Sequence, residues 1–306
     1  MMPIRFPEEY NYCAVFLTLG CQLKCSYCIN IQSYERSKLV VSRRTMTAKD
    51  WILALNRIEA RDDLPLTLQG GEPTSHKEFY EIINGIDRPM DLLTNCQFNI
   101  DEFIDRIPTT KFKRNAPYAS IRISFHPEQM DLVNTVNRVS TLFDHGYQVG
   151  VWMVEVPEQM YIVEKARFAF SQMGIPFKTK ELLGEHKGVV YGTYKYPGSV
   201  DAPKAQWKSC LCRTSELLVA PDGSIHRCHS DLYNLRQGIG HILDADFSLD
   251  RSFRYCSVFG SCSGCDTKVK TNRYQIFGHT SVEIERLGEV TGKDHNNFTV
   301  AELADV

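Results

Sequence analysis

The sequence predicts an α/β fold, a partial (β/α)6 barrel followed by a cysteine-rich C-terminal subdomain built on a β-hairpin. Two observations predict it. Short β-rich runs alternate with helical periodicity up to about residue 184, and six of the 11 cysteines lie in the last third of the chain. Such alternation is typical of βα units around a parallel sheet. Six repeats are too few for the eight of a closed barrel but suffice for an open, curved one.

The six predicted strands are short and rich in residues that favour β-structure. They cover residues 14–19, 65–69, 90–93, 119–124, 149–154 and 176–180. The helical segments predicted between them cover residues 47–61, 77–86, 100–107, 131–143 and 158–173. Thr47 and Asp50 have the spacing of a capping box, while Gly146 and Gly174 follow two of the helix ends.

We expect three regions along the chain. Residues 1–184 form the barrel, residues 185–209 a connecting segment, and residues 210–306 the second unit with a C-terminal tail. In the second unit, residues 217–220 and 225–228 flank Pro221-Asp222-Gly223, which predicts a β-hairpin with a tight turn.

Charge and hydropathy exclude several classes of protein. Lys plus Arg number 35 against 37 Asp plus Glu, so the formal charge is −2 and offers no surface for long nucleic acids. There is no apolar stretch long enough for a bilayer and no signal-peptide pattern at the start. We therefore expect a cytoplasmic protein with no membrane or nucleic-acid partner. In that compartment, clustered thiols are more often metal ligands or catalysts than disulfides.

Three cysteines follow the first predicted strand with C-x3-C-x2-C spacing: Cys21, Cys25 and Cys28. Thiolates this close can converge on one metal centre when the chain loops around it, as chains do around iron–sulfur clusters. Because only three are present, a [4Fe–4S] cluster held by them leaves one iron open to a substrate or cofactor. A structural zinc site or chance clustering is the alternative.

The triplet, with Tyr27 before its last cysteine, resembles the signature of the radical S-adenosylmethionine (SAM) superfamily. The second predicted strand ends in Gly-Gly-Glu-Pro, which is similar to the family's GGEP turn. The resemblance implies that the open iron binds the amino and carboxylate groups of SAM, and that the GGEP backbone hydrogen-bonds the SAM amino group. The cofactor-binding residues that it implies are Tyr27, Gly70, Gly71, Glu72, Pro73, Asn95 and Ser124.

Two residues depart from the family's usual pattern. Cys96 follows Thr94-Asn95 where relatives commonly have glycine, and His126 stands where many relatives have aspartate. Both follow predicted strands at the end of the barrel where active sites collect, so both are candidate catalytic residues. The alternatives are a buried structural thiol for Cys96 and a structural role for His126. Four residues near the ends of the fifth and sixth predicted strands are candidates for proton transfer by position alone: Glu155, Lys178, Lys180 and Glu181.

The second cysteine group brackets the predicted hairpin. Its candidate metal ligands are Cys210, Cys212, Cys228, Cys262 and Cys265, with Cys256 as a substitute. Zinc would be satisfied equally well by such a set. The spacing Cys-x(10 or 12)-Gly-x4-Cys, however, resembles the SPASM or shorter twitch extension of radical SAM enzymes. That resemblance implies one auxiliary [4Fe–4S] cluster, with either Cys210 or Cys212 in the first position.

The resemblance therefore implies a radical SAM enzyme, an oxidoreductase or a peptide- or metabolite-modifying enzyme. It would cleave SAM reductively and abstract a hydrogen atom from a peptide or small-molecule substrate. The auxiliary cluster would accept the electron or bind substrate, and a flavodoxin or ferredoxin would donate electrons. The alternatives are a two-cluster electron-transfer protein and a radical SAM barrel whose C-terminal cysteines hold zinc.

Overall fold

Six parallel strands form the barrel in the computed structural model, which describes residues 1–30, 45–61, 64–196, 198–270 and 280–287. These strands are β2 (Tyr12–Thr18), β4 (Leu66–Gly70), β5 (Met90–Thr94), β6 (Ile121–Phe125), β7 (Val149–Glu155) and β8 (Phe177–Glu181). All six predicted strands are thus confirmed, with ends shifted by one or two residues. The chain has the mixed α/β architecture that the alternating pattern predicts.

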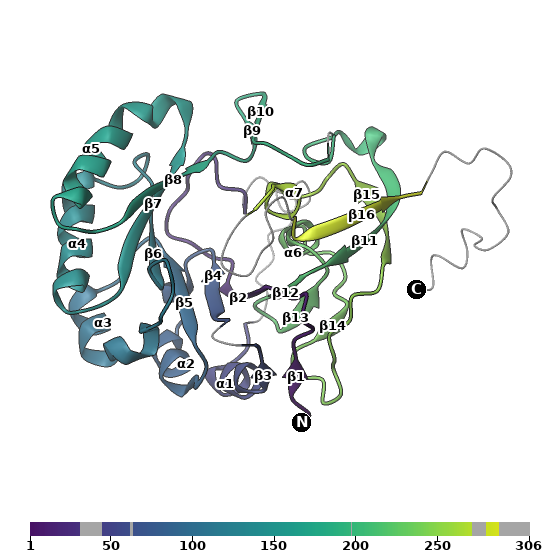
Figure 1. Ribbon diagram of the computed structural model, residues 1–306, viewed down its shortest axis with the longest axis horizontal. Helices are drawn as coiled ribbons and strands as arrows, with labels where there is room; N and C mark the ends of the chain where they lie inside the picture. The colour runs from purple at the N-terminus through teal and green to yellow at the C-terminus, as the bar shows by residue number, and fades with distance from the viewer. Residues whose placement is uncertain (31–44, 62–63, 197, 271–279, 288–306) are drawn as a thin grey trace, which may run out of the picture.

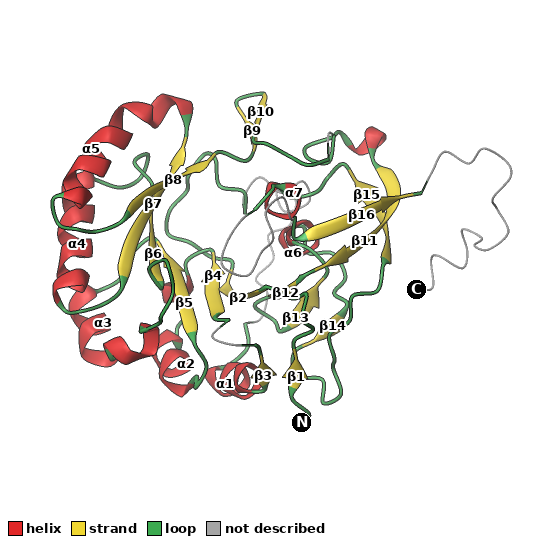
Figure 2. Cartoon of the chain, in the orientation of Figure 1, coloured by secondary structure: helices red, strands yellow, loops and turns green. Residues whose placement is uncertain are grey.

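Helices cover the convex outer face of this sheet (Figures 1 and 2). They are α1 (Ala48–Asn56), α2 (Phe79–Gly85), α3 (Ile100–Arg106), α4 (Leu132–Asp144) and α5 (Met160–Ser171), with the 3₁₀ segments η2 (Pro73–Ser75), η3 (Thr109–Phe112) and η4 (Pro157–Gln159). The Thr47 side chain accepts a hydrogen bond from the Asp50 backbone, as the capping pattern predicts. The first helix is shorter than predicted, because Ile58 and Glu59, which were predicted to be helical, form strand β3 (Ile58–Glu59). This strand pairs with β1 (Ile4–Arg5).

The predicted hairpin exists and extends the barrel sheet. It consists of β12 (Glu216–Val219) and β13 (Ser224–His226), which pair antiparallel, and β14 (Gly240–His241) follows. Strand β12 also pairs in parallel with β2, from Glu216 opposite Tyr12 to Val219 opposite Val15. The result is one nine-stranded sheet of order β14-β13-β12-β2-β4-β5-β6-β7-β8. The domain boundaries at residues 184 and 210 stay a prediction. The pairing of β12 with β2 joins the segment after residue 210 to the barrel.

The remaining C-terminal elements are β9 (Gly184–His186), β10 (Val189–Tyr191), η5 (Lys204–Gln206), β11 (Lys208–Thr214), α6 (His229–Tyr233), β15 (Arg254–Phe259), α7 (Gly264–Thr267) and β16 (Val282–Arg286). Among them, α6, α7 and the strands β11, β15 and β16 lie on the side of the barrel away from α4 and α5 (Figure 1). Strand β11 is the centre of a three-stranded sheet of order β15-β11-β16. No helix in the described ranges has both the length and the apolar character that a membrane span requires.

The inside of the barrel combines a small apolar layer with charged groups. Phe16, Leu218 and Tyr233 pack together where β2 meets β12. Deeper in the barrel, the fully buried Asp91 carboxylate pairs with Arg114 and lies 3.0 Å from Arg122 Nη2. A buried carboxylate of this kind depends on its cations, because an unpaired charge would be costly there.

Leu218→Ala should destabilise the protein, because Leu218 is fully buried at the junction of the hairpin and the barrel. A cost of about 2–5 kcal/mol is expected for a truncation of this kind. The matched control is Val133→Ala on α4, where the side chain is 67% exposed, and its effect should stay within about 0.5 kcal/mol. Urea unfolding of both variants would check this, and equal midpoints would contradict it.

Candidate active site at the carboxyl edge of the barrel

A cavity of about 310 Å³ opens at the carboxyl ends of the barrel strands. The predicted site residues that line it are Cys21, Cys25, Tyr27, Cys28, Gly70, Gly71, Glu72, Asn95, Ser124, His126 and Cys265. The structure therefore brings the N-terminal triplet, the Gly-Gly-Glu turn and the ends of β5 and β6 to one place. Pro73, which begins η2, is buried directly behind the turn.

The loop that carries the triplet is tied to two neighbouring strands. The Glu128 carboxylate, just beyond β6, accepts hydrogen bonds from Ser26 N at 2.9 Å and Ser26 Oγ at 3.2 Å. Asn95, at the end of β5, accepts from Gln22 Nε2 at 3.1 Å and its amide lies 3.6 Å from Cys21 Sγ. These contacts orient the thiols toward the cavity. Sequence reasoning missed Glu128, and its only signal was its position two residues after His126.

The two glycines of the turn pack directly against the end of β2. Gly71 N donates to Thr18 O at 2.9 Å and Glu72 N to Gly20 O at 2.7 Å. A Cβ would lie 2.1 Å from Thr18 O if added to Gly70, and 2.0 Å from Gly20 O if added to Gly71. Gly70 also has a φ of +145°. Glycine is therefore required here by close backbone approach, whatever ligand the turn binds.

Glu72 joins the ends of β4 and β5. Its buried carboxylate accepts hydrogen bonds from Thr94 Oγ1 at 2.7 Å and Asn95 N at 2.7 Å, and from Thr74 Oγ1 at 2.6 Å. Burial raises the pKa of Glu72, while these hydrogen bonds act to lower it. Because these hydrogen bonds occupy the carboxylate, Glu72 has a structural role in holding β4 and β5 together and is not free to act as an acid in the cavity.

Tyr27 and His126 form a polar pair in the cavity wall. The Tyr27 hydroxyl lies 3.0 Å from His126 Nδ1, and the ring centroids are 5.9 Å apart. Burial lowers the pKa of His126 to about 4. The imidazole is therefore neutral near pH 7, and its Nδ1 can accept the hydrogen bond from the tyrosine.

Cys96 does not line this cavity. Its side chain is fully buried in the hydrophobic core, and its backbone carbonyl accepts a hydrogen bond from Arg138 Nε at 2.6 Å. Its φ of 60° lies in the left-handed region, which residues other than glycine seldom adopt. Burial raises the pKa of the Cys96 thiol to about 12. With no exposed surface, Cys96 has no route to contact a substrate in this conformation.

A second group of thiols lies on the C-terminal sheet. Cys210 on β11 is the register partner of Cys256 on β15, and both pack with Cys212 in a buried cluster. Cys228 and Cys262 pack against the same cluster. These five residues are called the sheet thiols below. From the sequence, Cys256 was predicted only as a substitute ligand. The pairing of β11 with β15 places it opposite Cys210, and the spacing of cysteines in the sequence does not reveal that pairing.

Arg227 supplies positive charge beside the sheet thiols. Its guanidinium, 13% exposed, lies 2.7 Å from Asp231 Oδ2 and interacts electrostatically with Cys212, Cys228 and Cys256. Burial raises the pKa of the Cys228 thiol, and Arg227 opposes that effect. A nearby cation favours the thiolate, which is the form that binds metal.

Both thiol groups have the donor chemistry that an iron–sulfur cluster or zinc requires. The triplet presents three sulfurs to one cavity, and the sheet thiols offer five beside a cation. Within the described residues, no three Cys, His, Asp or Glu side chains are already arranged around one point at ligand distances. The two thiol groups therefore suit a metal centre by the chemistry of their sulfurs and by their proximity to one another.

Comparison with known proteins establishes the fold. No protein-family model matches the sequence, and no curated protein matches it. Among solved structures, anSMEcpe with bound AdoMet and Kp18Cys peptide is 16% identical with a TM-score of 0.51, over 79% of this chain and 78% of that chain. A histidine-tagged form of anSMEcpe with bound AdoMet is 15% identical with a TM-score of 0.51, at the same coverage of 79% and 78%.

A further similar structure is Streptococcus suis SuiB bound to precursor peptide SuiA, 12% identical with a TM-score of 0.45 over 79% of this chain. The chain spans 63% of the SuiB chain, less than two thirds of its length. These neighbours are radical SAM enzymes. The similarity to anSMEcpe confirms the expected fold: the chain has the α/β fold of radical SAM enzymes.

Gly71→Ala should destabilise the site, because the new Cβ would lie 2.0 Å from the Gly20 carbonyl oxygen. The cost expected for such overpacking is about 1–3 kcal/mol. Gly20→Ala is the matched control in the same region, where the nearest atom to a Cβ is Thr18 Oγ1 at 3.4 Å. Thermal unfolding of the two variants should give a lower midpoint for Gly71→Ala, and the opposite order would refute the packing role.

Mild acid should destabilise the protein through His126. Its pKa is about 4 in the folded chain against 6.5 for the ordinary group. Below pH 6.5 the unfolded chain binds a proton that the folded chain does not, so stability falls as the pH decreases from 6.5 toward 4. Urea unfolding at several pH values should show a shallower fall in His126→Gln. Equal slopes in variant and parent would show that His126 does not carry this effect.

Proposed function

We propose that this protein is a radical SAM enzyme that abstracts a hydrogen atom from a peptide substrate. One observation carries the proposal: the three triplet thiols and the glycine turn line the same cavity at the carboxyl edge of the barrel. The structures of anSMEcpe with bound AdoMet, which share this fold, support it.

The residues around the cavity have complementary roles in this proposal. Cys21, Cys25 and Cys28 hold a [4Fe–4S] cluster and leave one iron open. When bound, the cluster and SAM would supply an electron and a 5′-deoxyadenosyl radical, chemistry that belongs to the cofactors. The backbone at Gly70 and Gly71 would bind the SAM amino group, and Ser124 would lie near the SAM carboxylate, as the resemblance implies. Tyr27 and His126 contribute a neutral pair to the cavity wall.

The sheet thiols are the basis for a second proposal, one auxiliary [4Fe–4S] cluster. Cys228 and Cys262, with Cys210 or Cys212 and with Cys256 beside them, provide enough thiolates for it. Arg227 stabilises their anionic form. The cluster would accept an electron from the substrate radical or bind substrate, with a flavodoxin or ferredoxin as external donor. A structural zinc ion is the alternative that the same donors allow.

A peptide is favoured over a small metabolite by the shape of the site. A second cavity of about 320 Å³ adjoins the first, and Ile29 and Tyr233 line both. Together the two cavities suit an extended substrate better than a single small molecule. The similar structure of anSMEcpe contains a bound Kp18Cys peptide. We therefore propose that a peptide segment lies across Tyr233 with its reacting residue toward the triplet.

Anaerobically reconstituted protein should contain about eight irons, as expected for two [4Fe–4S] clusters. It should release 5′-deoxyadenosine from SAM in the presence of dithionite. Replacing Cys21, Cys25 and Cys28 together by Ala should remove about four irons, since each cluster holds four, and abolish the release. Iron analysis and chromatography of the products would measure both effects.

The matched control for that experiment is Cys13→Ala, because Cys13 is a fully buried thiol of β2 outside the cavity. It should leave iron content and SAM cleavage unchanged. Release of 5′-deoxyadenosine by the triple variant would overturn the proposed function. About four irons with bound zinc in the parent protein would instead assign zinc to the sheet thiols.

A further inference from the structure

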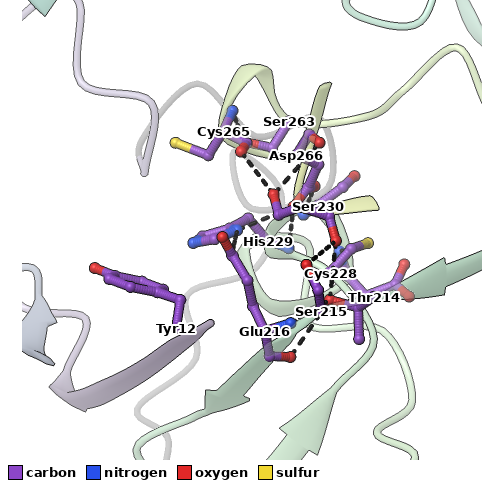
Figure 3. Close-up of polar contacts among 12 residues, drawn as sticks. Tyr12, Thr214, Ser215, Glu216, Cys228, His229, Ser230, Ser263, Cys265 and Asp266 are labelled. Carbon is purple, nitrogen blue, oxygen red and sulfur yellow. Dashed lines mark hydrogen bonds and ion pairs between the residues drawn. The ribbon is translucent and has the colours of Figure 1, made fainter. Parts of the chain in front are cut away.

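The six C-terminal cysteines separate into two places, although the sequence grouped them. Five of them are the sheet thiols. Cys265 is not among them and lines the cavity that also holds Cys21, Cys25 and Cys28. Figure 3 shows the sulfur of Cys265 directed to the side of Tyr12, while the sulfur of Cys228 lies on the opposite side of His229.

The residue next to Cys265 explains this direction. Asp266 is buried and accepts hydrogen bonds from the backbone of His229 at 2.9 Å and of Ser230 at 3.0 Å, at the start of α6. Its Oδ1 also lies 2.9 Å from His229 Nδ1. Because Asp266 is anchored on that side of α7, the Cys265 side chain projects away from α6 and into the cavity (Figure 3).

A cation without an acidic partner lies on the same cavity wall. Lys180, at the end of β8, lines the cavity, and no ion pair of its ammonium group occurs among the described residues. Its neighbour Glu181 pairs with Lys268 instead. Lys270, which is also near Cys265, pairs with Glu216 at 3.1 Å. Lys180 is therefore the cavity cation whose charge the described side chains leave uncompensated.

We propose that Cys265 is not a metal ligand, and that Lys180 and Cys265 form the part of the cavity wall that receives a carboxylate of the substrate. This assignment rests on the proposed function, because it assumes that the substrate reacts in this cavity. An ammonium group facing a cavity is the residue type that binds a carboxylate by charge-assisted hydrogen bonds. Lys180 would then be a specificity residue that positions an acidic or C-terminal carboxylate of the peptide beside the Cys265 thiol.

Alkylation of the reconstituted enzyme tests the placement of Cys265. Iodoacetamide near neutral pH should label Cys265 as the main site in peptide mass spectra, over a long reaction because burial raises the pKa of this thiol. Cluster ligands are protected by iron, and Cys13, Cys96 and whichever of Cys210 and Cys212 is not a ligand are protected by burial. Cys265→Ser should lose that label and retain the parent iron content. Protection of Cys265, or a loss of about four irons in Cys265→Ser, as a missing cluster would give, would overturn the proposal.

The charge of Lys180 is tested by comparing iodoacetate with iodoacetamide. Desolvation and the nearby Arg122 lower the pKa of Lys180 to about 8. Both reagents are therefore compared at about pH 7, where the ammonium form attracts the anionic reagent, and the rate ratio at Cys265 should fall about fivefold in Lys180→Gln. Lys178→Gln is the matched control, because Lys178 is on the same strand but lines a different cavity, near the starts of β2 and β4. An equal ratio in the parent and Lys180→Gln would refute the role of Lys180.

Binding of SAM separates the two possible sources of the carboxylate. Equilibrium dialysis should give the same Kd for SAM in the parent and in Lys180→Gln, as expected if the substrate supplies the carboxylate. A tenfold weaker Kd would assign Lys180 to SAM and overturn the proposal for the substrate. Labelling of Cys21, Cys25 and Cys28 would report a different failure, the loss of the cluster on which the proposed function depends.

Discussion

The parallel pairing of β12 with β2 is the contact on which the arrangement of both thiol groups depends. Strand β2 leads into the loop of Cys21, and β12 is followed through the hairpin by Cys228. Strand β13 then runs antiparallel to β12, so Cys228 follows near the start of β2, and α6 packs Tyr233 against Phe16 of β2. The C-terminal segment therefore closes one side of the cavity, and Tyr233 and Cys265 join its lining.

Buried carboxylates join the elements of the barrel and of the C-terminal segment. Glu72 joins the ends of β4 and β5, Asp91 pairs with two arginines inside the barrel, and Asp266 fixes α7 to the start of α6. Each is satisfied by donors from elements that are distant in sequence. A carboxylate that lost its donors would be left buried and unpaired, so these contacts strongly specify how the elements meet. The cavity is shaped by them as much as by its apolar residues.

Much of the fold could be predicted because its signals are local. Alternating β-rich and helical segments located the six strands and five helices, and the Thr47 cap and the glycines after α4 and α5 marked helix ends. The end of the first predicted helix was wrong, because Ile58 and Glu59 pair with β1 instead. Pairing between segments far apart in the chain leaves no trace in local periodicity, and tertiary contacts override helix propensity.

The sequence by itself determined the chemistry that is available: three closely spaced thiols after a strand, a glycine turn one βα unit later, and six further cysteines around a hairpin. Spacing cannot determine where a side chain points, since cysteines close together in the chain can face different partners. Only the tertiary structure placed Cys256 opposite Cys210, through the register of β11 and β15, and directed Cys265 into the cavity, through the anchoring of Asp266. Both outcomes depend on hydrogen bonds between segments far apart in the chain, which form only when the chain is folded.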